Sequence, residues 1–323
     1  MRIFLFFFTA AVAVSQTAPQ ILTSHTTEGL RGASAVSRTI AWASGTQGTY
    51  LRTTDGHTWI PDQVRGAESL DFRGVAAFSA DEAFLMSAGP GDQSRIYHTT
   101  DAGRHWALQF TNKNPKGFFD TMVFWDRSHG IVLGDPVPDE SGTLKFELLM
   151  TEDGQNWSPV STAQLPPAVD GEGAFAASNS CIAILHGNTG EGPGRALDPN
   201  IWFASGGKVA RVFHSADRGR TWQVFDTPIN HGPDSAGIFS IAFRDAMHGV
   251  IAGGDYKHPD QDGPNLAFSS DGGKTWTLSQ IVPQYYYSSV AFDRRYDDVR
   301  AKTAKPEPAN ENQMGARIFL AGP

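Results

Sequence analysis

Three carboxylates in this chain could carry chemistry. Asp120, Asp135 and Glu172 lie in or beside the segments that connect strand-like apolar runs. Two carboxylates in one cleft could act as general acid and general base on a glycosidic bond, provided that the fold sets the right separation between them. An acidic surface without catalytic activity is the alternative. The elements that position these residues therefore decide which chemistry is open to them.

A second acidic group follows further along the chain. Asp255, Asp260 and Asp262 place oxygen atoms at short spacing and could hold Ca²⁺, but the run lacks the full twelve-residue calcium loop and its closing glutamate. A solvated acidic loop is the simpler interpretation, and we expect no metal. The histidines show no zinc-binding spacing, and no dinucleotide, haem or redox-cysteine motif is present, so we expect no cofactor.

Composition and the first residues restrict the class of protein. The formal net charge of -8 over 323 residues argues against a nucleic-acid partner, which normally requires a basic face. Residues 1–15 are typical of a signal peptide, with Arg2 before an apolar run and small residues ahead of the cleavage point. We expect a periplasmic or secreted protein with no membrane span after cleavage. Residues 16–323 would then form one domain, in which Cys181 is a buried, inert thiol.

A short motif recurs five times. Three copies share the pattern Ser/Thr-x-Asp-x-Gly-x-x-Trp, and two are one residue shorter. The aspartate can accept hydrogen bonds from backbone N–H groups just downstream, the glycine permits the positive φ of a turn, and the tryptophan can pack against a neighbouring unit. The aspartates and tryptophans, which we expect to be structural, are Asp55 and Trp59, Asp101 and Trp106, Asp153 and Trp157, Asp217 and Trp222, and Asp271 and Trp276.

The spacing of the motif predicts the architecture. Successive motif aspartates are 46, 52, 64 and 54 residues apart, and a four-stranded propeller blade needs about 40–50 residues before insertions. We therefore predict an all-β protein, a β-propeller of four-stranded blades, with seven blades in the full-length protein and six as the alternative. Residues 289–293 and 317–322 supply only two strands of the last unit, which indicates that the last blades are truncated. Residues 21–31 could close the ring as an outer strand.

The repeat resembles the Asp-box (BNR) repeat of sialidases and of several non-enzymatic propellers. In those families the box forms the turn between the third and fourth strands of a blade. The chain is also similar to bacterial proteins related to the photosystem II stability/assembly factor, a resemblance carried by residues 72–75, 210–213 and 237–243 and by the tryptophan-ended boxes. That resemblance implies a binding scaffold, although relatives are often labelled oxidoreductase or glycosyl hydrolase. The early arginine motif of sialidases is absent, so no sialidase catalytic residue is assigned here.

Blade geometry separates the boxes from the expected binding face. If the boxes join third and fourth strands, the second-to-third loops and the crossings between blades lie on the opposite face. Loops on a rigid scaffold are the usual place for binding. The residues predicted on that face are Arg73, Asp135, Glu172, Arg211, Asp255, Tyr256 and Lys257.

Two functions remain open from the sequence. The first is an exported, monomeric, non-catalytic scaffold that binds a protein or peptide partner, in the manner of an assembly factor. The alternative is a glycan-active hydrolase of the sialidase-like type that uses Asp120, Asp135 or Glu172. The family resemblance and the missing catalytic set favour the scaffold.

Overall fold

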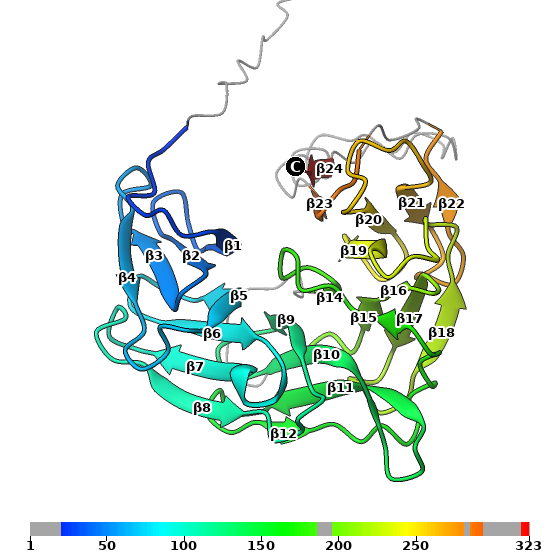
Figure 1. Cartoon of the computed structure of the whole chain (residues 1–323), viewed down its shortest axis with the longest axis horizontal. Coiled ribbons are helices and arrows are strands. Elements are labelled where there is room, and N and C mark those ends of the chain that lie inside the picture. Colours follow the sequence, from blue (N-terminus) through cyan, green and yellow to red (C-terminus); the bar gives the residue numbers. More distant parts are fainter. Residues whose placement is uncertain (1–20, 186–195, 281–284, 293–317, 323) are drawn as a thin grey trace, which may run out of the picture.

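The computed structural model describes residues 21–185, 196–280, 285–292 and 318–322. In this part of the chain, short antiparallel strands form sheets that stand around a common axis (Figure 1). The signal-peptide prediction for residues 1–15 and the glycine-rich loop at residues 187–194 lie outside the described residues. We name the sheets blades 1 to 6 in chain order.

The strands of the six blades are as follows. Blade 1 contains β1 (Leu30–Ala35), β2 (Ala41–Gly45), β3 (Thr49–Thr53) and β4 (Ile60–Gln63). Blade 2 contains β5 (Asp71–Ala77), β6 (Ala83–Ala88), β7 (Arg95–Thr99) and β8 (Ala107–Thr111), with the 3-10 turn η1 (Gly91–Gln93) between β6 and β7. Blade 3 contains β9 (Phe119–Phe124), β10 (Gly130–Pro138), β11 (Leu144–Thr151) and β12 (Ser158–Pro159). Blade 4 contains β14 (Ile182–Ile184), β15 (Ile201–Ala204), β17 (Arg211–Ser215) and β18 (Gln223–Asp226). Blade 5 contains β19 (Ala236–Phe243), β20 (Gly249–Asp255), β21 (Leu266–Ser269) and β22 (Thr277–Leu278), extended at its inner edge by β16 (Gly206–Gly207) and β13 (Glu172–Gly173). Blade 6 contains β23 (Ser289–Phe292) and β24 (Ile318–Ala321).

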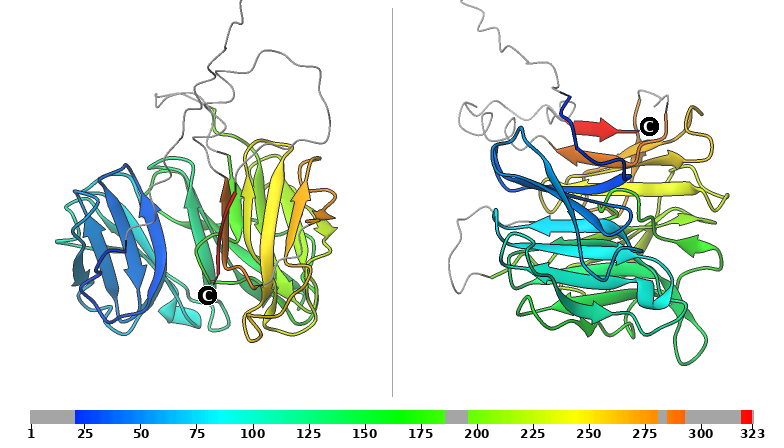
Figure 2. Two further views of the ribbon diagram at one scale, coloured as in Figure 1. Left: turned by 90° about the horizontal axis from the view of Figure 1, so that it is seen from above. Right: turned by 60° about the vertical axis from the view of Figure 1, so that its left-hand side comes forward.

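The first strand of each blade lies nearest the axis. The inner strands β1, β5, β9, β14, β19 and β23 contact one another in turn. The described sheets do not complete a circle, because β1 and the β23–β24 pair stand at its two ends (Figures 1 and 2). The predicted all-β architecture of four-stranded antiparallel blades is confirmed. The number of blades in a closed ring and the truncation of the last blades stay predictions.

The expected closing strand at residues 21–31 is wrong. Within the described residues 21–29 no strand forms, while Leu30 and Arg31 belong to β1, the innermost strand of blade 1. The physical reason is a local tie: the backbone N–H of Thr46 donates to the carbonyl of Gly29 at 3.0 Å, and the Gly29 N–H donates to Thr46 Oγ1. These bonds hold the incoming chain on the β2–β3 turn of its own blade.

Each predicted box is a turn between the third and fourth strands of a blade. In blade 3, Asp153 Oδ1 accepts the backbone N–H groups of Gln155 and Asn156 at 2.8 and 2.7 Å. The Gly154 N–H, at a residue with φ of 69°, donates to Thr151 Oγ1 at 2.9 Å. In the other four boxes the aspartate likewise accepts at least one backbone N–H, and the Ser or Thr hydroxyl accepts the N–H of a box glycine. The box aspartates therefore hold turns together.

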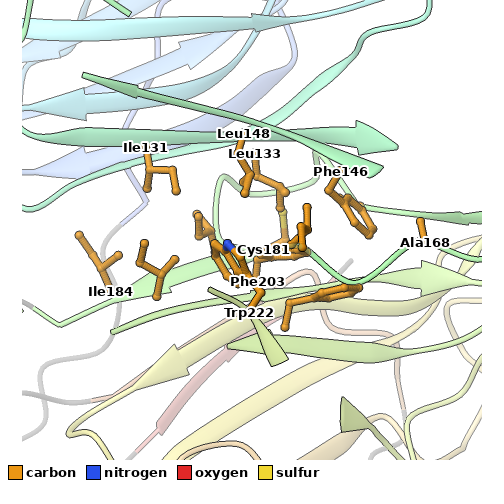
Figure 3. Close-up of a cluster of buried hydrophobic side chains, with 14 residues drawn as sticks. Ile131, Leu133, Phe146, Leu148, Ala168, Cys181, Ile184, Phe203 and Trp222 are labelled. Carbon is orange, nitrogen blue, oxygen red and sulfur yellow. The ribbon is translucent and has the colours of Figure 1, made fainter. Parts of the chain in front are cut away.

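The core lies between neighbouring blades. In Figure 3, Ile131, Leu133, Phe146 and Leu148 of blade 3 face Cys181, Phe203 and Trp222, which come from blade 4 and the chain just before it. Burying one large apolar side chain stabilises the fold by about 1.5–3 kcal/mol. Cys181 is a free, fully buried cysteine, and burial raises the pKa of its thiol well above the usual range, which accounts for an inert thiol.

The part of the chain that the structure describes contains no helix with the length and apolar character of a membrane span.

Candidate functional site

The face opposite the box turns carries the second-to-third loops and the crossings between blades. We call the part of that face around the axis the mouth. The inner strands begin at the mouth, so Arg73 of β5 and Asp120 of β9 lie there. Asp135 of β10 lies there as well, just after the irregular pairing of β10 with β9 at Leu133 and Gly134. Sequence-predicted residues from blades 2 and 3 are thereby brought together.

The crossing from blade 3 to blade 4 bonds to inner strands of several blades around the axis of the ring. Residues 174–180, which we call the channel segment, follow β13 and lead into β14 (Figure 1). The segment is bound by polar groups of the mouth: its Ala174 N–H donates to Asp135 Oδ1 at 2.9 Å, and its Ala176 carbonyl accepts from Arg73 Nη1 at 3.0 Å. In both contacts the side chain of the mouth residue bonds to a backbone group of the channel segment and not to one of its side chains.

Two further anchors fix the channel segment. Asn179 has a φ of 56°, and its side-chain oxygen accepts the Met122 N–H at 2.7 Å while its amide donates to the Met122 carbonyl at 3.0 Å. Phe175 stacks on Phe239 of blade 5 with ring centroids 3.8 Å apart. A Cβ at Gly206 would lie 2.3 Å from Phe175 Cε2, so the ring fits only because β16 has a glycine at that position.

A cluster of three carboxyl groups lies beside the channel segment. Burial, with the negative charges of Asp135 and Glu147 added, raises the pKa of Asp120 well above its usual range, although Arg73 opposes this. Burial raises the pKa of Asp135 to about 6, against the hydrogen bond from Ala174, and it also raises the pKa of Glu147. Asp120 is 1% exposed, and its Oδ2 has no hydrogen-bond partner among the described residues. The cluster can hold protons near neutral pH, with Asp120 closed off from solvent while Asp135 and Glu147 are half-buried.

Glu172 is buried in an ion pair with Arg211. Its carboxylate accepts Arg211 Nε at 2.9 Å, Ser205 Oγ at 2.6 Å and the backbone N–H of Val169 at 2.9 Å, and Arg211 Nη2 makes a further bond. The Glu172 side chain is fully buried and that of Arg211 is 12% exposed. The two predicted face residues neutralise each other, which leaves Glu172 without a lone pair free for catalysis.

The rim of the mouth on blade 5 carries the exposed groups. Asp255 is buried and accepts the Lys257 N–H at 2.9 Å and His258 Nδ1 at 2.8 Å, so it forms a turn. Tyr256 is 49% exposed, packs edge-on against Phe239, and has Lys257 Nζ 6.0 Å from its ring centre. This rim can offer an aromatic plate and a cation to a ligand.

The candidate calcium site does not form. Asp260 and Asp262 are exposed, while Asp255 is engaged in its turn. Among the described residues no group of three or more His, Cys, Asp or Glu side chains could hold a metal ion. The acidic run at residues 260–262 is a solvated loop.

Sequence reasoning missed Glu147 and the whole channel segment. The one sequence feature that pointed to the channel segment was the 64-residue interval between the third and fourth box aspartates, which is the longest interval between successive boxes. Part of that insertion is the channel segment.

Comparison with solved structures decides the fold. A GH74 enzyme from Niastella koreensis is similar with a TM-score of 0.53 at 14% identity, over 81% of this chain and 42% of that one. The protein is a β-propeller. The propeller is also similar to YCF48 from Cyanidioschyzon merolae, with a TM-score of 0.41 at 19% identity over 84% of this chain and 92% of that one. The structure of YCF48 bound to D1 peptide is similar with a TM-score of 0.40 at 17% identity, over 83% of this chain and 86% of that one. No protein-family model and no curated protein matches the sequence. At these identities the similarity establishes the fold alone.

Proposed function

We propose that the propeller is an exported, non-catalytic scaffold that binds a protein or peptide partner on its mouth face. The observation that carries this proposal is the channel segment. The mouth already holds a stretch of the chain's own polypeptide through its backbone, with Asp135 accepting an N–H and Arg73 donating to a carbonyl. Groups arranged in this way recognise peptide.

The state of the carboxylates supports binding over catalysis. A general acid or base must reach the proton that it transfers, within hydrogen-bond distance or through one water. Glu172 is enclosed by four donors, and Asp120 is 1% exposed. The exposed rim offers Tyr256 instead, beside Lys257, and aromatic side chains such as tyrosine are enriched at protein interfaces.

Export is part of the proposal and rests on the sequence of residues 1–15, with its basic start and short apolar run. The partner would then be met outside the cytoplasm, in the periplasm or beyond. The excess of acidic over basic residues agrees with a partner that is not a nucleic acid.

The test is partner capture with a matched pair of variants. The mouth variant carries Tyr256→Ser and Lys257→Glu, and the control carries Met247→Ser and Lys274→Glu, which are equally exposed positions at the box face. Immobilised protein is incubated with envelope extract, and bound proteins are cross-linked and identified. We expect one reproducible partner with the wild type and the control, and its loss with the mouth variant. Equal recovery by all three proteins, or no reproducible partner, would contradict the proposal.

A glycan-active hydrolase is the second candidate, favoured by one observation. The raised pKa values of Asp120, Asp135 and Glu147 mean that at least one carboxyl can be protonated near neutral pH, as a general acid requires. A panel of chromogenic glycosides tests it with Asp135→Asn and Glu172→Gln. Turnover that these substitutions abolish would establish the hydrolase, whereas no turnover, or turnover that they leave unchanged, would exclude these residues.

A further inference from the structure

The box of blade 4 differs from the other long boxes at two positions of its turn. In the long boxes of blades 2, 4 and 5, the residue after the aspartate has a positive φ: Ala102 at 67°, Arg218 at 59° and Gly272 at 80°. Glycine adopts this conformation freely, whereas a long side chain there is unusual. Blade 4 alone among these boxes has arginine at this position and again two residues later, so Arg218 and Arg220 flank Gly219.

The side chain of Arg218 reaches back to blade 3. Its Nη2 lies 2.9 and 3.1 Å from the two carboxylate oxygens of Glu152, and its guanidinium lies over the ring of Trp125, 5.5 Å from the ring centre. These contacts fix the guanidinium at the junction of blades 3 and 4, which accounts for an arginine at a strained backbone position. They do not involve Arg220, which is exposed and forms no ion pair with a described residue.

A groove with a volume of about 560 Å³ lies between the box turns of blades 3 and 4, and we call it the inter-box groove. Blades 3 and 4 are both complete four-stranded sheets, so the groove is a junction inside the ring. Small-molecule sites have volumes of roughly 300–1,000 Å³. The lining residues come from the two boxes and from the end of blade 3, and they are Met150, Glu152, Asp153, Asn156, Ser158–Ser161 and Arg218–Arg220.

The carboxylates at the groove already have partners. Glu152 is paired with Arg218. Asp153 accepts three hydrogen bonds from groups of its own turn, and Asp217 accepts the N–H and the hydroxyl of one residue of its turn. The guanidinium of Arg220 is therefore left without an acceptor among the described residues, and a ligand that enters the groove can supply one.

The charges of the groove favour a ligand with a single negative charge. Its lining residues include two acidic and two basic side chains, so the groove has no formal net charge. A doubly charged phosphate would meet both carboxylates, whereas one carboxylate can accept two parallel hydrogen bonds from Arg220. Met150, Pro159 and Val160 offer apolar surface beside that arginine, and methionine adapts its shape to different neighbours.

We propose that the inter-box groove binds a small organic molecule with one carboxylate group, which Arg220 holds while Met150, Pro159 and Val160 contact its apolar part. Arg218 positions the two boxes on either side of the ligand through its ion pair with blade 3. The groove lies among the box turns, on the face opposite the mouth. The proposal is independent of the function proposed above, so either can fail alone.

The experiment titrates the full chain with carboxylic acids and follows the backbone amides by NMR. Hexanoate, 4-phenylbutyrate and cyclohexanecarboxylate are each compared with the primary amide, which keeps the shape of the acid and loses its charge. The test variants are Arg220→Gln, which removes the carboxylate partner, and Ser161→Trp, which fills the groove from an exposed position. The control is Arg104→Gln, an exposed arginine at the same position of the blade 2 box, where Ala102 stands in place of Arg218. Circular dichroism and urea unfolding of each variant confirm folding.

We expect at least one acid to cause saturable shifts at the amides of Ser161 and Arg220 and to bind more tightly than its amide. Its affinity should fall by about tenfold or more in Arg220→Gln, since a charge-assisted bond is lost, and stay unchanged in Arg104→Gln. No saturable binding of any acid, equal binding of acid and amide, or full affinity in Arg220→Gln would overturn the proposal. A protein from envelope extract that requires Arg220, with none of the acids bound, would assign the groove to a protein interface and also overturn it. Partner capture by the mouth variant tests the proposed function separately, and none of these outcomes changes its result.

Discussion

The substitution Asp135→Asn should stabilise the protein at neutral pH. Burial raises the pKa of Asp135 from 3.8 to about 6. A carboxyl whose pKa is higher in the folded state gives full stability below pH 4, and that stability is lost as the pH rises through 6. A difference of roughly two pKa units corresponds to about 3 kcal/mol. Asparagine keeps an oxygen that can accept the Ala174 N–H but carries no charge to desolvate.

The assay is urea unfolding of the wild type and the variant between pH 4 and pH 8. The free energy of unfolding should be equal near pH 4, and the variant should be more stable by up to about 3 kcal/mol at pH 7 and above. Loss of the Asp135 charge also relieves Asp120 and Glu147, which acts in the same direction. The matched control is Asp262→Asn, which makes the same chemical change at an exposed position. An Asp135→Asn protein that is less stable at pH 7, or a difference independent of pH, would refute the reasoning.

Three further substitutions test the packing of the mouth by urea unfolding. Glu172→Ala should cost about 3–5 kcal/mol, because Arg211 would be left buried without its partner; a cost below 1 kcal/mol would contradict the ion pair. Asn179→Gly keeps the positive φ but removes the side-chain bonds to the inner strands, so it should cost about 2–4 kcal/mol and speed hydrogen exchange of the Met122 amide; unchanged exchange would contradict the anchor. Gly206→Ala should cost about 1–3 kcal/mol, because its Cβ would clash with Phe175 and with the backbone at Gly237 and Ala236; adding Phe175→Leu should recover the part due to the ring, and additive costs would contradict the ring clash.

The repeat made the blade architecture predictable because its information is local. An aspartate that binds the N–H groups two to four residues later defines a turn wherever it occurs, as Asp153 does with Gln155 and Asn156. The turn fixes the third and fourth strands, and the apolar runs before it supply the first two. Five copies at blade-like intervals therefore predicted the first five sheets in order, and two apolar runs predicted the strands that pair as β23 and β24.

The mouth was less predictable because its contacts join residues far apart in the chain. Glu172 and Arg211 form an ion pair, but nothing in their spacing shows that one neutralises the other. Arg73 binds the carbonyl of Ala176 across 103 positions of sequence. The sequence left Glu172 as a candidate catalytic carboxylate because its ion-pair partner was unknown. The fold supplies that partner, Arg211, and the residues near Glu172 in the sequence do not indicate it.

The channel segment joins blades 3, 5 and 6 across the axis, and this has a consequence for binding. Asn179 holds Met122 of blade 3, while Ser180 Oγ donates to Ser240 of blade 5 and Ser178 Oγ donates to the carbonyl of Ser288 just before blade 6. These bonds cross the axis, so they resist a change in the separation of blades 3, 5 and 6. A ligand that entered the axis would have to break them. Partner binding at the rim leaves them intact, and for this reason we place recognition around the axis and not in it.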